Sequence, residues 1–165
     1  MKQTYRAVAG LIALGVVVQA GAIAFGWFDA LNKIDNGLVV DKNYQGNVGH
    51  AIHGVNGEMV IPVLGLILLI VSFFAAKEIP GARKWAAIVF GAIVLQVALA
   101  FVAFGAPIVG ALHGVNALVV LGTAGRTSML AREAASAGRS ASGGQVSVPQ
   151  QSTGPSVSTE TSRPA

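Results

Sequence analysis

Three long runs without a charged residue dominate this sequence, at positions 7–28, 59–76 and 85–125. An α-helix needs about 20 apolar residues to cross the hydrocarbon core of a bilayer. The third run is roughly twice that length and is interrupted by Gly105-Ala106-Pro107. We therefore expect it to form two helices joined by a tight turn. Pro107 suits the start of the second of these helices, because the first helical turn does not use the N–H that proline lacks.

The composition also indicates a membrane protein. Hydrophobic residues make up 53% of the chain and charged residues 11%, whereas soluble domains are about a quarter charged. In lipid each backbone polar group needs an internal partner, which favours helices. The sequence predicts an all-α, integral membrane, four-helix up-and-down bundle in residues 1–133. Its expected spans are residues 7–28, 53–76, 85–104 and 107–126.

Lysine and arginine are distributed unevenly along this predicted bundle. Most precede the first span, lie between the second and third, or follow the fourth. Only Lys33 and Lys42 lie on the other side, so the positive-inside rule predicts that the N- and C-termini lie in the cytoplasm. We expect the chain in the plasma membrane. The lipid bilayer is the expected partner. The basic residues flank apolar runs without interleaved aromatics, which argues against a nucleic-acid partner.

From residue 134 onward the composition changes to Ser, Thr, Gly, Pro and Gln, which predicts a disordered cytoplasmic tail over 134–165. Good helix formers after Arg126 extend the expected last helix to about Ala137. The chain has no cysteine, which excludes disulfides and thiol catalysis. No serine–histidine–acid arrangement and no paired carboxylates stand out, so the sequence favours a non-enzymatic role.

The two halves of the apolar region resemble each other. His-Gly-Val-Asn occurs at 53–56 and again at 113–116, each time near the start of an even-numbered span. The preceding span carries a single glutamine, Gln19 or Gln96, and ends in Ala-Phe-Gly. These matches predict an internal two-helix repeat whose copies are related by an axis along the membrane normal.

Helical periodicity places these polar residues on faces of small side chains. Gln19 aligns with Gly15, Ala22 and Gly26, and Gln96 aligns with Ala92, Ala100 and Ala103. Small residues allow membrane helices to approach closely, and polar side chains between them act as cross-links. We expect both glutamines and both histidines of the repeated motif to face the bundle interior.

The repeated histidines suggest a cofactor site. His53 and His113 are candidate axial ligands of one b-type haem held between the second and fourth spans, with a glycine beside each histidine leaving room for the macrocycle. Such a site would serve electron transfer or haem handling. Four amide side chains are candidate supporting donors: Asn56, Asn116, Gln19 and Gln96.

Segments 96–100 and 112–118 resemble one four-helix half of haem A synthase and related b-haem bundles. Over roughly residues 5–130 the chain resembles more closely a family of uncharacterised small four-span bacterial membrane proteins with the same histidine placement. The resemblance implies a bundle that holds haem near the outer face. The chain has one bundle and lacks the His-Arg pairs of haem A synthase, so the resemblance does not extend to haem A synthesis.

Three other interpretations stay open at this point. The histidines could hydrogen-bond across helices as structural residues, in a non-catalytic accessory subunit of a larger membrane complex or in a self-associating bundle. His50 and His53 share a helix face and could bind a small metal ion with Glu58. A small transporter is a weaker alternative, because the spans contain few ionisable groups.

One spacing conflicts with a shared iron. His53 lies almost twice as far before Lys77 as His113 lies before Arg126. If these basic residues mark the same depth, the histidines do not face each other. A last helix that continues past Arg126, or a kink at Pro62, would remove the conflict.

Overall fold

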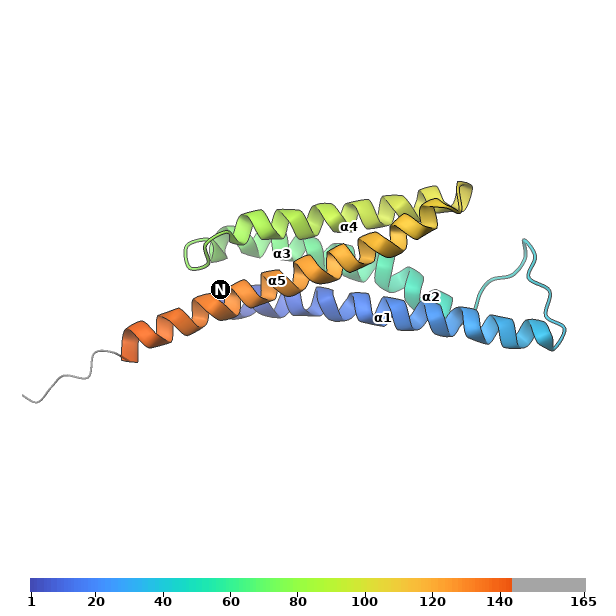
Figure 1. Cartoon of the computed structure of the whole chain (residues 1–165), viewed down its shortest axis with the longest axis horizontal. Coiled ribbons are helices and arrows are strands. Elements are labelled where there is room, and N and C mark those ends of the chain that lie inside the picture. The colour runs from blue at the N-terminus through green and yellow to red at the C-terminus, as the bar shows by residue number, and fades with distance from the viewer. Residues whose placement is uncertain (144–165) are drawn as a thin grey trace, which may run out of the picture.

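The computed structural model describes residues 1–143, which form helices and connecting loops without a β-strand (Figure 1). The helices are α1 (Lys2–Asp35), α2 (Val48–Val55), the π-helical turn η1 (Asn56–Val60), α3 (Ile61–Ala75), α4 (Ala82–Gly105) and α5 (Val109–Gly143). Because α2, η1 and α3 follow one another without a break, the helices form four rods.

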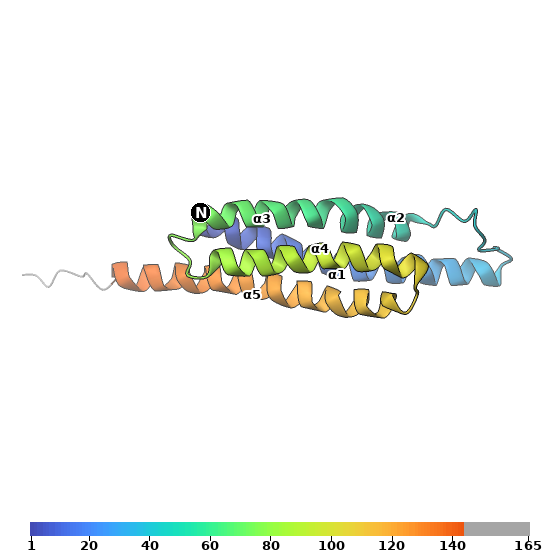
Figure 2. The same cartoon turned by 90° about the horizontal axis from the view of Figure 1, so that it is seen from above.

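The rods run alternately up and down, as expected. α1 packs against α5 and against the rod of α2 and α3, while α4 packs against α3 and α5. The N-terminus and the α3–α4 turn lie at one end, and the α1–α2 loop and the α4–α5 turn lie at the other (Figures 1 and 2). We call these the terminal end and the loop end. α1 extends past the α4–α5 turn at the loop end, and α5 extends past the α3–α4 turn at the terminal end.

Three helical segments within residues 1–143 are long and apolar enough to cross a membrane: α1, the continuous rod Val48–Ala75, and α4. We expected four. α5 is long, but it does not meet this standard, because His113, Asn116 and Arg126 interrupt its apolar residues. The fourth span at 107–126 therefore stays a prediction.

The helices are longer than the apolar runs that predicted them. The second rod begins at Val48 rather than at residue 53, because the Asn47 side chain caps its first turn by accepting hydrogen bonds from the backbone N–H groups of Gly49 and His50. α1 continues to Asp35. α5 continues to Gly143, past the expected helix end at about Ala137 and into the predicted disordered tail of 134–165, and the rest of that predicted tail lies outside the described residues.

Apolar packing is tightest toward the terminal end. Tyr5, Ile12, Leu68, Val89 and Ile93 are fully buried there, and the Tyr5 hydroxyl donates a 2.8 Å hydrogen bond to the Ala82 carbonyl. This contact joins α1 to the start of α4. The apolar core thus holds the two halves of the chain together at the terminal end. Close backbone contacts hold the helices together at the loop end.

At the loop end, glycines rather than large side chains set the packing. A Cβ atom added to Gly49 of α2 would lie 2.6 Å from both the Ala22 carbonyl oxygen and the Gly26 nitrogen of α1. No side chain fits at that distance, so glycine allows the two backbones to touch. This crossing places α2 directly on the face of α1 that carries Gln19, as the small-residue pattern predicted.

Candidate functional site

The two histidines of the repeated motif meet inside the bundle. His53 in α2 and His113 in α5 have ring centres 6.3 Å apart, with their planes inclined by 60°. α2 packs on α1 and α5 packs on α4 and α1, so the imidazoles bridge the two halves of the chain. The depth conflict in the sequence is therefore resolved. α5 runs far beyond Arg126, which does not mark its end.

In the first half, α1 supplies backbone acceptors for both polar side chains of the motif. His53 Nδ1 lies 3.2 Å from the Gln19 carbonyl oxygen, and Asn56 Nδ2 donates a 3.0 Å hydrogen bond to the Gly15 carbonyl. A carbonyl oxygen only accepts, so Nδ1 is the donor in this contact, and in the neutral ring Nε2 keeps its lone pair.

The second half repeats this arrangement on α4. His113 Nδ1 lies 3.1 Å from the Gln96 carbonyl oxygen, and Asn116 Nδ2 donates to the Ala92 carbonyl at 2.9 Å. The bonded carbonyls belong to the glutamine and to the residue four positions before it, as they do in α1. These contacts confirm that the small-residue faces of α1 and α4 point at the histidine helices. The interpretation as an internal repeat stays a prediction.

The two glutamine side chains behave differently. The Gln96 side-chain oxygen accepts a 2.7 Å hydrogen bond from Asn116 Nδ2, and its Nε2 lies 3.1 Å from His113 Nε2 and 3.2 Å from His113 Nδ1. The side-chain oxygen of Gln19 is buried without a hydrogen-bond partner. The Nε2 atom of Gln19 lies against Gly57, in the space that a side chain at position 57 would occupy. Only Gln96 therefore contacts its histidine through the side chain.

The second rod also carries a feature that the sequence did not reveal. Between Asn56 and Val60 the helix widens into a π turn, and the backbone N–H of Ile61 bonds the Asn56 carbonyl, five residues back. Pro62 follows immediately and has no N–H to continue the α-helical pattern. A π turn contains one residue more than an α-helical turn, so it rotates the side chains before it relative to those after it. A kink at Pro62 was one of the two ways in which the depth conflict could be removed, and the helix accommodates the proline by this π turn.

His50 does not join the pair. Its ring packs edge-on against Trp27 at 5.0 Å and Tyr44 at 6.2 Å, and its Nδ1 contacts the Asn47 side-chain oxygen at 2.9 Å. Glu58 is exposed. Within residues 1–143 no three His, Asp or Glu side chains lie close enough together to hold a metal ion. The geometry therefore gives no support to a small-metal site of His50, His53 and Glu58.

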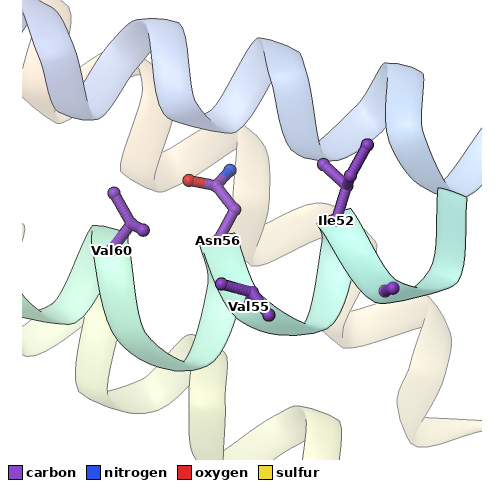
Figure 3. Close-up of a pocket in the computed structure, with 5 residues that line it drawn as sticks. Ile52, Val55, Asn56 and Val60 are labelled. Atoms are coloured by element: carbon purple, nitrogen blue, oxygen red, sulfur yellow. The ribbon is translucent and has the colours of Figure 1, made fainter. Parts of the chain in front are cut away.

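A hollow of about 330 Å³ lies beside the motif, lined by Ala51, Ile52, Val55, Asn56 and Val60 (Figure 3). Asn56 points from it toward α1, while Ile52, Val55 and Val60 are exposed. His53 is not among its lining residues, so the hollow and the histidine pair are separate features of the same rod.

No protein-family model matches this chain, and no curated protein and no solved structure shows significant similarity to it. The interpretation of the site therefore rests on its own geometry. The resemblance to haem A synthase and to small four-span bacterial proteins stays a prediction.

Proposed function

We propose that this chain is a four-span membrane protein that holds one b-type haem between His53 and His113. The observation that carries this proposal is the 6.3 Å separation of the two ring centres. An imidazole nitrogen binds a transition metal at about 2 Å, and its ring centre lies about 1 Å further away. Two imidazoles on opposite sides of one ion thus have centres roughly 6 Å apart.

The hydrogen bonds around the rings support the same assignment. Metal-binding histidines usually donate their second N–H to a carbonyl or carboxylate, which fixes the ring and leaves the other nitrogen free for the metal. His53 and His113 both place Nδ1 against a backbone carbonyl. Apart from the adjacent residues and backbone of the same helix, no atom lies within 4 Å of a Cβ added at Gly54 or Gly114, so the residue beside each histidine leaves open space. A bound haem would supply one-electron redox chemistry.

The membrane assignment is supported by the distribution of apolar side chains. Large residues such as Phe28, Phe104 and Ile108 are more than two-thirds exposed (73%, 85% and 82%), which suits a lipid environment. α5 packs along both α1 and α4, which are each long and apolar enough to cross a bilayer. We therefore place α5 in the membrane beside them, with the basic terminal end in the cytoplasm.

A second candidate is an accessory subunit of a membrane complex in which the histidines only cross-link helices. The observation that favours it is Gln96, whose amide nitrogen lies near both ring nitrogens of His113. The Nδ1 contact with the Gln96 carbonyl and the amide packed against the ring hold His113 in place without a metal. This candidate predicts a companion protein, or a second copy of the chain, that remains bound through purification in mild detergent.

Haem titration of detergent-purified protein from haem-poor cells separates the two candidates. We expect saturable quenching of the fluorescence of Trp27 and Trp85 at one haem per chain. The double variant His53→Ala, His113→Ala should lose saturable binding, while His50→Ala should retain it, since His50 contacts neither ring. Linear, unsaturated quenching in the parent protein, or equal binding by the double variant, would refute the haem proposal.

A further inference from the structure

We propose that the terminal end of the bundle is a binding surface for the headgroups of anionic phospholipids, centred on Lys77, Arg83 and Lys84. Lys77 lies in the α3–α4 turn, and the other two lie in the first turn of α4. The proposal depends on the membrane placement in the proposed function and is independent of haem. It names a partner that the positive-inside rule does not supply, because that rule concerns orientation and not the lipid that is bound.

Positive charge at the terminal end exceeds the acidic partners that the chain provides. Glu78 lies 3.7 Å from Lys2 Nζ, and Glu133 lies 2.8 Å from Arg126 Nη1, so both acidic side chains at this end of residues 1–143 are already paired. The exposed cations at this end that form no ion pair within residues 1–143 are Arg6, Lys77, Arg83, Lys84 and Arg132. A surface with this surplus attracts anions.

Contacts between helices bring these cations to the same end of the bundle. The Tyr5 hydroxyl bonds the Ala82 carbonyl, so Arg6 on α1 lies near the start of α4. The Ser128 hydroxyl donates to the Arg6 carbonyl at 3.4 Å, which brings α5 beside α1 there. The N-terminus and the α3–α4 turn lie together at this end (Figure 2). The unpaired charge is thus spread over α1, the α3–α4 turn, α4 and α5, as a lipid leaflet around the bundle requires.

Exposed apolar side chains next to the cations favour a phospholipid over a soluble acidic partner. Lys84, Ile88 and Leu95 are spaced by four and seven residues, so they share one face of α4, and all three are exposed. Phe74, which is 60% exposed, lies at the end of α3 shortly before Lys77. A phospholipid carries a phosphate followed by acyl chains in this same order. One lipid molecule can therefore contact a cation and the apolar strip beside it.

Trp85 marks the depth of the headgroups at this turn. A Cβ added to Gly81 would lie 3.6 Å from Trp85 Cδ1, so the indole ring packs on the α3–α4 turn. Tryptophan rings prefer the headgroup level of a bilayer. Lysine and arginine at this level are attracted to anionic lipid, and the attraction weakens within a Debye length of the surface. Trp85 therefore reports on the lipids beside Arg83 and Lys84.

The loop end has the opposite balance of charge and serves as the comparison. Lys33 is paired there with Asp29 at 2.8 Å, and Lys42 is exposed and forms no ion pair within residues 1–143. Asp35 and Asp41 add negative charge at this end. Trp27 lies in α1 near the same end and packs edge-on against His50. We therefore expect no preference for anionic lipid near Trp27.

Quenching of tryptophan fluorescence by brominated phospholipids measures lipid preference at each end. The chain has two tryptophans, so Trp27→Phe leaves only Trp85 and Trp85→Phe leaves only Trp27. Haem-free protein is placed in mixed bilayers of phosphatidylcholine and phosphatidylglycerol in which one or the other lipid is brominated. We expect phosphatidylglycerol to be preferred about threefold beside Trp85 and not at all beside Trp27.

Charge-removing variants and salt separate this surface from a general effect of the bilayer. In the Trp27→Phe background, the triple variant Lys77→Gln, Arg83→Gln, Lys84→Gln should lose the preference. Lys42→Gln removes an exposed, unpaired cation at the loop end and should leave the preference at Trp85 unchanged. In the unsubstituted surface, sodium chloride at about 1 M should also abolish the preference, because screening then acts over about 3 Å.

Equal preference at the two tryptophans, or an unchanged preference in the triple variant, would overturn the lipid surface. If polyglutamate then binds the parent but not the triple variant in phosphatidylcholine bilayers, the surface belongs to an acidic protein instead. If no brominated lipid quenches either tryptophan, the membrane placement itself fails together with this proposal. A chain that takes up no haem but keeps the preference at Trp85 loses the proposed haem site and retains the lipid surface.

Discussion

The polar side chains of the site are held by backbone carbonyls of a neighbouring helix. Gln19 and Gln96 act first through their main-chain oxygens, which accept from His53 and His113. Sequence analysis identified these four residues because each is polar within an apolar run. It predicted that both glutamine side chains support a cofactor site, and that role stays a prediction; in the structure the Gln96 side chain contacts His113, whereas the Gln19 side-chain oxygen has no hydrogen-bond partner. Side-chain spacing carries no information on carbonyl acceptors, and these appear only when helices are packed.

The two motif asparagines should contribute unequally to stability. Asn116 is 8% exposed and donates to two acceptors, whereas Asn56 is less buried and donates to one. We expect Asn116→Ala to cost about 1–2 kcal/mol of unfolding free energy and Asn56→Ala roughly half as much. Unfolding by sodium dodecyl sulfate in mixed micelles, followed by circular dichroism, measures both. A larger loss in Asn56→Ala would contradict the assigned contacts.

Gly49 is the residue whose enlargement should most disturb the loop end. Its added Cβ would meet two backbone atoms of α1 at 2.6 Å, and backbone does not yield as a flexible side chain does. We expect Gly49→Ala to cost about 1–3 kcal/mol, as overpacking usually does. Gly91→Ala in α4 is the matched control, because nothing lies within 4 Å of its Cβ. The same micelle unfolding assay compares them, and an equal effect of both variants would show that the close crossing is absent.

At the scale of elements, apolar runs predicted the rods well and their ends poorly. Lack of charge defines where a helix can lie in lipid, but a helix ends where its backbone groups find other partners. Asn47 starts α2 by capping Gly49 and His50, ahead of the apolar run. Arg126 ends the predicted fourth span, and the helix was expected to stop near Ala137; Thr127 and Ala131 are buried, and α5 runs on to Gly143. The π turn at Asn56–Val60 depends on local backbone bonding that residue patterns do not encode.

The π turn sets the direction in which His53 points. Deleting the exposed Met59 should convert η1 to ordinary α-helix and rotate His53 by about 100° relative to α3. We expect haem binding to fall at least tenfold while helical content, measured by circular dichroism, stays constant. Deleting exposed Val39 from the α1–α2 loop is the control and should preserve binding. Unchanged binding after deletion of Met59 would show that the π turn does not position the histidine.

At the scale of the whole molecule, the rods are offset so that α1 projects from the loop end and α5 from the terminal end (Figure 2). If the bundle spans a membrane, these projections lie on opposite sides of it. Under the positive-inside rule, the basic residues at the terminal end predict that this side faces the cytoplasm. Four apolar segments were enough to predict that the helices alternate in direction and that both chain ends lie at the same end of the bundle. They did not predict how far α1 and α5 project beyond the other helices.

Cysteine labelling tests this topology directly, because the chain has no cysteine of its own. A membrane-impermeant maleimide should label Val39→Cys in intact cells and should label Ser136→Cys only after permeabilisation. Both positions are exposed in the structure, so access depends on the side of the membrane. Labelling of Ser136→Cys in intact cells, with Val39→Cys protected, would reverse the proposed orientation.

The central claim is that His53 and His113 hold one haem. The most direct measurement is the absorption spectrum of the protein purified from haem-replete cells, recorded oxidised and then reduced with dithionite. We predict a Soret band that shifts on reduction together with sharp α and β bands of a b-type haem, all absent from the double variant His53→Ala, His113→Ala. A featureless visible spectrum from the parent protein, in either state, would contradict the haem site and favour histidines that only cross-link the helices.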